Sequence, residues 1–301
     1  MSFFKNEIQE FLDKREINYQ KNISFSTLSY LKLGEDVELA AFPETYLDFC
    51  EILRFSFKKS IPFRVIGRMS NVLPPGGVFN GVVISTVRLN RIHIEKDTVT
   101  VESGVFLPSL AKVLLPYGMS GFEELSGIPA SVGGAVYMNA GAYGREISDT
   151  LLYATVYDKT KDRALITDKS ELDFSYRKSR FSKRELYLLN ATFKCTLKPM
   201  QEISQKVKAY AQKRRLTQPL SYPSLGSVFK RYGGNSAGYY IDTAGLKGFS
   251  IGDAEVSKMH ANFFINKGSA TRAEYFALIK EVKRRVYDFH GIMLCEEIEY
   301  F

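Results

Sequence analysis

The chain has 301 residues, of which 45% are hydrophobic and 25% charged. This composition is ordinary for a globular protein and excludes a largely disordered one, and the length predicts two domains or one large α/β domain. Lysine and arginine number 41 against 33 acidic residues, and the resulting formal charge of +8 favours anionic partners such as nucleotides and phosphates.

Several functional classes are not expected. The three cysteines, Cys50, Cys195 and Cys295, are far apart and show no C-x-x-C spacing, so we expect neither disulfides nor a metal site, and a reducing cytoplasm fits. The N-terminal residues follow helical spacing and no run of about 18 apolar residues occurs, so no membrane insertion is expected. The basic stretches 177–184 and 206–215 lie in no recognisable nucleic-acid-binding module, so no nucleic acid is expected as a partner.

Short strands and helices follow the first helix. Strand patterns occur at 37–42, 62–73, 81–86, 98–104 and 187–197, and helix patterns at 46–58 and 107–118. From Met200 to Leu216 a helix is predicted that must end before Pro219. Its proposed buried face consists of Ile203, Val207, Tyr210 and Ala211.

The last third contains a strand pattern at 261–266 and a capping-box signature formed by Thr271 and Glu274. The helix that begins there is expected to turn one apolar set inward, namely Leu278, Ile279, Val282, Val286 and Phe289. The strand-like segment LCEEIEYF, residues 294–301, follows.

One segment, Gly121–Asp149, is unusually rich in glycine, with glycines at 121, 127, 133, 134, 141 and 144. Glycine permits positive φ and lets backbone amides approach a ligand closely. Tight turns between short strands are the alternative interpretation. The apolar neighbours favour close approach, because turn glycines usually accompany Asn, Asp and Pro.

Residues 127–144 of this segment, GIPASVGGAVYMNAGAYG, resemble the flavin-binding signature of the UDP-N-acetylenolpyruvoylglucosamine reductases, the MurB family. One branch of that family carries an extra tyrosine-bearing substrate loop. No insertion between Arg177 and the helix at 200 would hold such a loop, so the chain resembles the shorter second type.

A second stretch, Ile66–Leu73 (IGRMSNVL), is similar to the family's L-G-x-G-S-N-x-L loop, with Met69 in place of a glycine and Arg68 in place of a small residue. Such a loop presents backbone amides to a pyrophosphate. A positive φ at Met69 would cost roughly 1 kcal/mol. The resemblance implies FAD contacts from Gly67, Arg68, Met69, Ser70, Asn71, Gly127, Ile128, Pro129, Ser131, Gly133, Gly134, Ala135, Asn139, Gly141 and Ala142.

Three later segments resemble the family's catalytic motifs. Residues 173–181 are similar to Y-R-x-S-x-F, which implies that Arg177 holds the substrate carboxylate; taken alone, it reads as a surface arginine. Residues 223–230 are similar to A-G-S-x-F-K, which implies that Ser227 is the proton donor; taken alone, it reads as a turn serine.

The third segment, 291–298, is similar to G-V-x-L-E-x-E-V and makes Glu297 the second catalytic acid, with Glu296 on the opposite face of the strand. Candidate substrate contacts are Tyr143, Lys230 and Arg231. His260 is interpreted as structural or adjacent to the substrate, because no partner carboxylate or metal-ligand spacing accompanies it.

The resemblance implies an α+β fold: a two-subdomain FAD-binding fold of the vanillyl-alcohol-oxidase/PCMH type plus a C-terminal α+β substrate-binding domain. We expect the FAD-binding domain over residues 1–196, divided near 70, and the substrate-binding domain over 197–301. The last strand is a candidate to return to the FAD-binding domain.

The implied activity is reduction of UDP-N-acetylglucosamine enolpyruvate to UDP-N-acetylmuramate for peptidoglycan. Hydride would pass from NADPH to FAD N5 and then to substrate C3, with protonation at C2. Two alternatives stay open: an FAD oxidase or dehydrogenase of the same fold acting on another small alcohol or sugar, and a non-catalytic flavin-binding protein.

Overall fold

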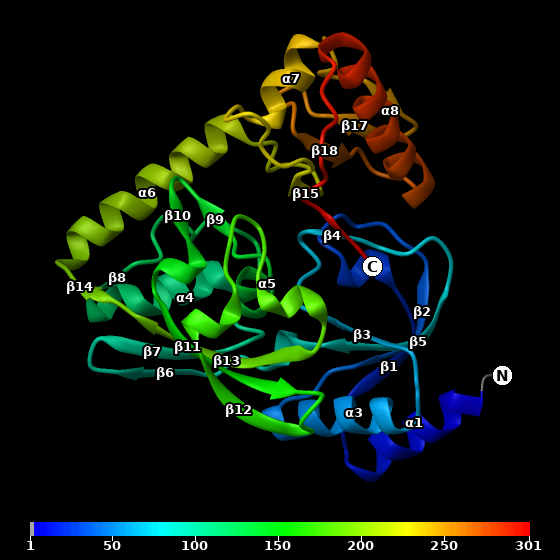
Figure 1. Cartoon of the computed structure of the whole chain (residues 1–301), viewed down its shortest axis with the longest axis vertical. Coiled ribbons are helices and arrows are strands. Elements are labelled where there is room, and N and C mark those ends of the chain that lie inside the picture. The colour runs from blue at the N-terminus through cyan, green and yellow to red at the C-terminus, as the bar shows by residue number, and fades with distance from the viewer. Residues whose placement is uncertain (1–2) are drawn as a thin grey trace. The chain divides into compact units, whose positions relative to one another are not determined.

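The computed structural model describes residues 3–301, with side chains from residue 6 onward. The chain forms two compact units (Figure 1). Unit 1 comprises Met1–Lys21, Leu39–Arg68 and Asn80–Gln212, and unit 2 comprises Asn22–Glu38, Met69–Phe79 and Lys213–Phe301. Both units mix helices and strands, as the predicted α+β class requires.

The first sheet has the strand order β1-β2-β5-β3. Its strands are β1 (Tyr19–Ser24), β2 (Asp36–Ala41), β3 (Phe63–Ile66) and β5 (Phe79–Ser85), and β3 runs parallel to β5. Helices α1 (Phe3–Lys14) and α3 (Tyr46–Lys58) share a core with this sheet, and the rings of Phe11 and Phe55 stack 4.2 Å apart. The predicted helix 46–58 is confirmed, and the Thr45 side chain caps it by accepting the Asp48 N–H.

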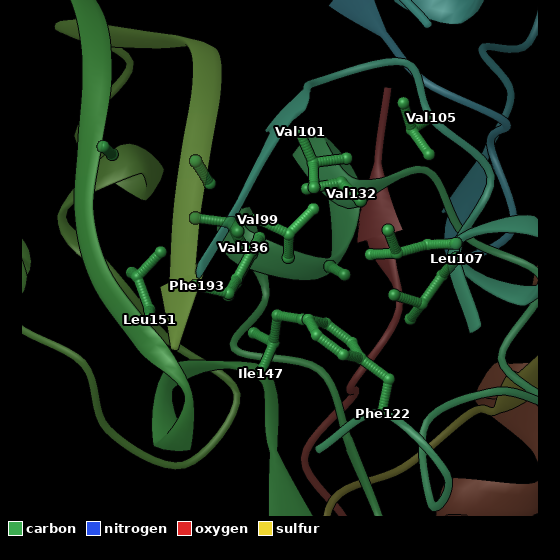
Figure 2. Close-up of a cluster of buried hydrophobic side chains, with 14 of the residues drawn as sticks. Val99, Val101, Val105, Leu107, Phe122, Val132, Val136, Ile147, Leu151 and Phe193 are labelled. Carbon is green, nitrogen blue, oxygen red and sulfur yellow. The ribbon is translucent and has the colours of Figure 1, made fainter. Parts of the chain in front are cut away.

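The second sheet of unit 1 has the order β12-β11-β13-β7-β6 and is antiparallel throughout. Its strands are β6 (Ile92–Glu95), β7 (Thr98–Glu102), β11 (Leu151–Asp158), β12 (Arg163–Asp168) and β13 (Leu186–Lys194). Alternation along β7 buries Val99 and Val101 against the apolar residues of α4 (Leu107–Leu114) and α5 (Val132–Tyr137) (Figure 2). The glycine-rich segment is therefore anchored on a packed core.

Short elements connect these sheets and helices: α2 (Phe25–Leu28), β8 (Met119–Ser120), β9 (Gly141–Ala142), β10 (Arg145–Glu146) and β14 (Thr196–Leu197). The long helix α6 (Met200–Thr217) confirms the predicted helix. Of its proposed buried face only Ile203 is fully buried, and the other three residues are half-buried.

Unit 2 contains a four-stranded sheet of order β15-β18-β17-β16. The strands are β15 (Ser224–Ser227), β16 (Ser250–Ile251), β17 (Ala254–Val256) and β18 (Phe263–Asn266), and the helices are α7 (Ala237–Thr243) and α8 (Arg272–His290). The last strand, β19 (Glu299–Tyr300), pairs in parallel with β4 (Val72–Leu73).

The capping box of α8 is confirmed, since Thr271 accepts from the Glu274 N–H and Glu274 accepts from the Thr271 N–H. The predicted burial of one apolar face of α8 is confirmed for Leu278, Ile279, Val282 and Val286. It is wrong for Phe289, whose side chain is 66% exposed. In this last helical turn it is the neighbouring His290 that contacts α7, at Tyr240 and Thr243. Among the helices of residues 3–301, none is both long enough and apolar enough to cross a membrane.

Candidate active site

In the loop that follows β3, the backbone at Gly67 lies close to the Ser131 side chain. A Cβ on Gly67 would collide with the Ser131 hydroxyl, so this position needs glycine. Met69, which replaces a glycine in the family pattern, has φ of 47° and is buried. Met69 therefore has a left-handed backbone conformation, which costs roughly 1 kcal/mol.

Arg68 in the same loop has the chemistry of an anion ligand. Its guanidinium carbon lies 4.2 Å from the centre of the Phe106 ring, and burial lowers the pKa of the side chain. Its Nε atom is buried and meets no hydrogen-bond partner within the described residues. Among residues 3–301, no backbone carbonyl accepts from the N–H groups of Arg68, Met69 and Ser70. These donors fit the pyrophosphate of FAD.

The glycine-rich segment supplies helix α5, whose first turn is capped by Ser131. The Gly133 N–H donates to the Ser103 carbonyl at 2.7 Å, and the Gly134 N–H donates to Ser131 Oγ at 3.2 Å. A Cβ on Gly133 would lie 2.9 Å from the Ser103 carbonyl oxygen. Gly133 thus lets the start of α5 lie close to the segment of Ser103, and the FAD contacts of Gly133 and Gly134 stay a prediction.

The other predicted FAD contacts in this segment lie before and after α5. Gly127 ends a turn, Ile128 and Pro129 lead from it to the helix, and the Ile128 N–H donates to the Leu125 carbonyl. Ala135 is buried within α5. After the helix, Gly141 and Ala142 form β9, which pairs with Arg145 and Glu146.

Arg177 is held by the backbone of this segment. Its Nη2 donates to the Gly141 carbonyl at 3.0 Å, its Nη1 donates to the Asn139 carbonyl at 3.4 Å, and the side chain is 16% exposed. The guanidinium carbon lies 4.8 Å from the centre of the Tyr176 ring. Arg177 itself has φ of 52°, a strained conformation of the kind that clusters at functional sites.

Glu146 is a residue that sequence reasoning missed. Its carboxylate accepts from Asn139 Nδ2 at 2.7 Å and lies 3.7 Å from Arg177 Nη1. Asn139 is 1% exposed and also binds the Ser175 carbonyl and the Ser148 N–H. The available signal was the position of Glu146 directly after the G-A-Y-G-R run, with Asp149 at capping-box spacing.

Tyr143 stacks on Tyr210 of α6, with ring centres 4.7 Å apart. The Tyr210 hydroxyl donates to Glu124 at 3.2 Å. Tyr143 also has a left-handed backbone, with φ of 53°. The ring of Tyr143, a predicted substrate contact, is thus held in place by Tyr210 within unit 1.

In unit 2 the segments of Ser227 and Glu297 are hydrogen-bonded neighbours. The Glu297 N–H donates to the Val228 carbonyl at 2.7 Å, and the Lys230 N–H donates to the Cys295 carbonyl at 2.8 Å. Ser227 ends β15 opposite Phe263 and follows Gly226, whose φ is 76°. Two motifs that lie far apart in the sequence thus form one structure.

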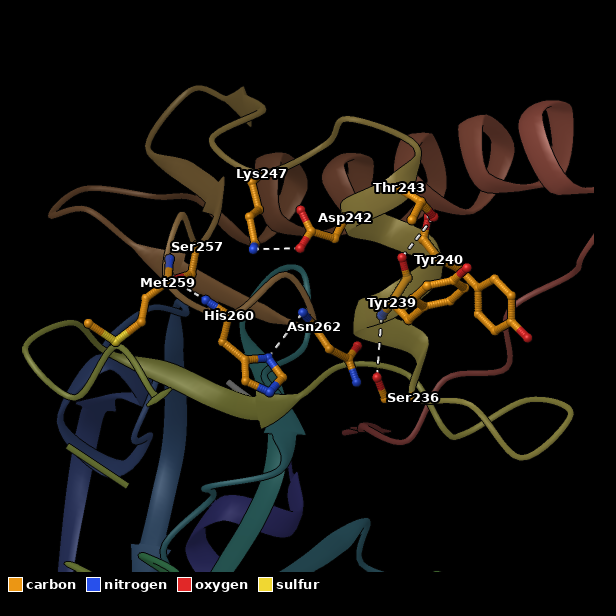
Figure 3. A network of polar contacts seen from close by, with 10 residues as sticks. All are labelled: Ser236, Tyr239, Tyr240, Asp242, Thr243, Lys247, Ser257, Met259, His260 and Asn262. Atoms are coloured by element: carbon orange, nitrogen blue, oxygen red, sulfur yellow. Dashed lines mark hydrogen bonds and ion pairs between the residues drawn. The ribbon is translucent and has the colours of Figure 1, made fainter. Parts of the chain in front are cut away.

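Asn262, which the sequence did not indicate, holds the segment after Ser227 through two further hydrogen bonds. Its side chain accepts from the Phe229 N–H at 3.0 Å and donates to the Phe229 carbonyl at 2.8 Å. Nearby, His260 Nδ1 accepts from the Asn262 N–H at 3.3 Å (Figure 3). The His260 ring packs edge-on against Phe263. Burial lowers the pKa of His260, which agrees with a structural role.

The neighbouring residues Glu296 and Glu297 are held through different groups, the carboxylate of one and the backbone carbonyl of the other. Glu296 binds Lys283 Nζ at 2.6 Å, whereas the Glu297 carbonyl accepts from Asn71 Nδ2 at 3.1 Å. The predicted substrate contact Lys230 is half-buried, and Arg231 is exposed at the start of the turn that Tyr232 and Asn235 close. Asn139, Gly141 and Arg177 therefore meet in unit 1, and Asn71, Ser227 and Glu297 share hydrogen-bonded segments of unit 2.

Two family models match successive parts of the chain. The family model described as FAD binding domain matches residues 37–162. The model described as UDP-N-acetylenolpyruvoylglucosamine reductase, C-terminal domain, matches residues 218–301. The predicted combination of a PCMH-type FAD-binding domain with a second α+β domain is confirmed.

Individual relatives agree over nearly the whole chain. The UDP-N-acetylenolpyruvoylglucosamine reductase of Caldicellulosiruptor saccharolyticus is 37% identical over 96% of this chain and 94% of its own length. That of Streptococcus pneumoniae strain 70585 is 36% identical over 98% of this chain and 97% of its own. The crystal structure of the Thermus caldophilus enzyme is similar with a TM-score of 0.80 and 30% identity, covering 95% of this chain and 98% of that one. The chain belongs to the UDP-N-acetylenolpyruvoylglucosamine reductase family.

Proposed function

We propose that this chain reduces UDP-N-acetylglucosamine enolpyruvate to UDP-N-acetylmuramate with FAD and NADPH, a step of peptidoglycan precursor synthesis. Family membership over nearly the full length supports this activity. The observation that carries the mechanism is the hydrogen bond between the Glu297 N–H and the Val228 carbonyl, because it joins the segments of two proposed catalytic residues. No observation favours an oxidase or a non-catalytic flavoprotein.

FAD is proposed to bind through residues 67–71 and through the segment 127–142. The Arg68 Nε atom and the backbone N–H groups of Arg68, Met69 and Ser70 are hydrogen-bond donors that suit its pyrophosphate. Bound FAD would supply the hydride chemistry, taking hydride from NADPH and passing it to C3 of the enolpyruvyl group. The protein would supply orientation, charge and protons.

Arg177 is proposed to hold the substrate carboxylate. A guanidinium offers a planar fork of donors that matches a carboxylate, and two of its nitrogens are already oriented by the Asn139 and Gly141 carbonyls. Because this orientation exists before substrate arrives, little reorganisation would be needed when negative charge develops on the carboxylate.

Ser227 is proposed to protonate C2, and Glu297, carrying a proton, to stabilise by hydrogen bonding the negative charge that develops at the substrate carboxylate. A serine hydroxyl is a weak acid, so donation requires a strongly basic carbon and a neighbouring group that stabilises the resulting alkoxide. Tyr143, Lys230 and Arg231 are proposed contacts for the rest of the substrate, whose diphosphate suits the cationic side chains of Lys230 and Arg231.

We also propose that residues 1–196 serve FAD binding and 197–301 substrate binding, that the chain is of the shorter second type, and that it works in the cytoplasm. The second type is supported by the short link from β13, which ends at Lys194, to α6, which begins at Met200. The cytoplasmic location is supported by the substrate, a nucleotide sugar, and by the cysteine pattern.

The test is NADPH oxidation by the purified, FAD-loaded protein, followed with and without UDP-N-acetylglucosamine enolpyruvate. We expect rapid oxidation only when the enolpyruvyl substrate is present. A rate that is independent of that substrate, or a protein that shows no flavin absorbance after addition of FAD, contradicts the proposal.

A further inference from the structure

Asn71 makes two hydrogen bonds to the C-terminal segment. Its side-chain Nδ2 donates to the Glu297 carbonyl at 3.1 Å, and its own carbonyl accepts from the Glu299 N–H at 2.8 Å. The pairing continues as the parallel strands β4 and β19, with Val72 opposite Glu299. All of these residues belong to unit 2. The loop predicted to bind FAD is therefore hydrogen-bonded to the segment that contains the proposed catalytic glutamate.

Glu297 is consequently held on both sides of its Cα atom. Its N–H donates to the Val228 carbonyl at 2.7 Å, and its carbonyl accepts from Asn71. The flanking peptides are fixed as well, since the Lys230 N–H binds the Cys295 carbonyl and the Glu299 N–H binds the Asn71 carbonyl. With both neighbouring peptides fixed, the direction in which the Glu297 side chain leaves the backbone is fixed too.

The amide side chain of Asn71 suits this task. It offers two N–H donors at the end of a short side chain, carries no charge and is half-buried. Serine is shorter and leucine has no donor, so neither reproduces the bond. Without a donor the Glu297 carbonyl would lose its partner, and the segment would have freedom to shift.

We propose that Asn71 is a positioning residue for Glu297: its side chain sets the placement of the glutamate, beyond the FAD contact that its place in the loop predicts. This inference rests on the proposed catalytic role of Glu297. A displacement of about 1 Å in a catalytic group can cost about 100-fold in rate. Loss of the Asn71 side chain should therefore slow reduction of the enolpyruvyl group by more than it slows reduction of the flavin by NADPH.

The experiment compares Asn71→Ser and Asn71→Leu with the wild-type holoenzyme and with Asn80→Ser, the same replacement at an exposed asparagine of β5. FAD content and the rate of flavin reduction by NADPH are measured first, without the enolpyruvyl substrate. The substrate is then mixed with reduced enzyme, and flavin reoxidation is followed in a single turnover. Thermal unfolding shows which variants are folded, and the serine variant suffices if the leucine variant is not.

Both half-reactions are expressed per bound FAD, so that any weakening of the FAD contact is taken into account. On this basis we expect reoxidation by the substrate to slow about 10- to 100-fold more than flavin reduction in both Asn71 variants. In a Glu297→Gln background, Asn71→Ser should cause little further loss, because the two residues act through one interaction. Asn80→Ser should behave as wild type.

Equal slowing of both half-reactions per bound FAD, unchanged reoxidation, or the same loss in the Glu297→Gln background would each overturn the positioning role. A variant that binds no FAD even with FAD in excess would assign the side chain to the cofactor alone and would also overturn it. Wild-type reduced enzyme that is not reoxidised by the substrate would instead overturn the proposed function, and this inference with it.

Discussion

Glu146 joins Asn139 to Arg177: one carboxylate oxygen accepts from Asn139 Nδ2 at 2.7 Å, and the other lies 3.7 Å from Arg177 Nη1. Asn139 in turn presents its carbonyl to Arg177. The proposed carboxylate-binding arginine is thus aligned by a buried amide and an acid from the same segment.

This arrangement predicts different outcomes for two replacements of Glu146. Glu146→Ala leaves the buried Asn139 amide without its carboxylate and should lower the free energy of unfolding by about 1–3 kcal/mol. Glu146→Gln keeps an acceptor and should cost less than about 1 kcal/mol, because it removes only a partly exposed ion pair. Urea unfolding of both variants measures the difference, and equal losses would contradict the role assigned to the acceptor.

Replacement of Ser227 should separate the two half-reactions. Ser227→Ala removes the proposed proton donor, so turnover should fall by about 100-fold or more, while reduction of the flavin by NADPH continues at the wild-type rate. Stopped-flow measurements resolve the two steps. Ser250→Ala, at an exposed position of β16, is the matched control. Turnover near the wild-type rate in Ser227→Ala would remove Ser227 from the mechanism.

Restoring glycine at position 69 should destabilise the protein. Met69→Gly relieves a left-handed backbone worth about 1 kcal/mol. It also removes a side chain that is only 3% exposed, and truncating a buried methionine usually costs about 2–5 kcal/mol. The second effect is larger, so the unfolding midpoint in urea should fall. A midpoint above that of the wild type would show that strain dominates at this loop.

His260 should make the protein less stable in mild acid. Burial lowers its pKa in the folded state, so below its ordinary value near 6.5 the unfolded chain binds a proton that the folded chain does not. Stability therefore falls as the pH drops from about 6.5 toward the lower folded pKa. His260→Asn, which keeps an acceptor for the Asn262 N–H, should show a smaller fall in Tm between pH 7.5 and 5.5. An identical pH dependence in both proteins would contradict this prediction.

Local patterns account for the elements that were predicted correctly. The helix over residues 46–58 and the capping box at Thr271 depend on side chains within a few positions of one another, so the sequence contains the relevant information. The helical spacing of Val282 and Val286 predicts that Phe289 points inward, but its side chain is exposed. Periodicity describes a face of a helix and does not say where the covering element ends.

By itself, the sequence determined the family, the cofactor class and the candidate residues, because runs such as GIPASVGGAVYMNAGAYG are long and ordered. Only the tertiary structure decided which groups align the candidates: Glu146 and Asn139 for Arg177, and Asn71 for Glu297. It also decided that Gly133 meets the Ser103 carbonyl. The physical reason is that hydrogen bonds between distant segments depend on how strands and loops pack in space, and no local spacing encodes that packing.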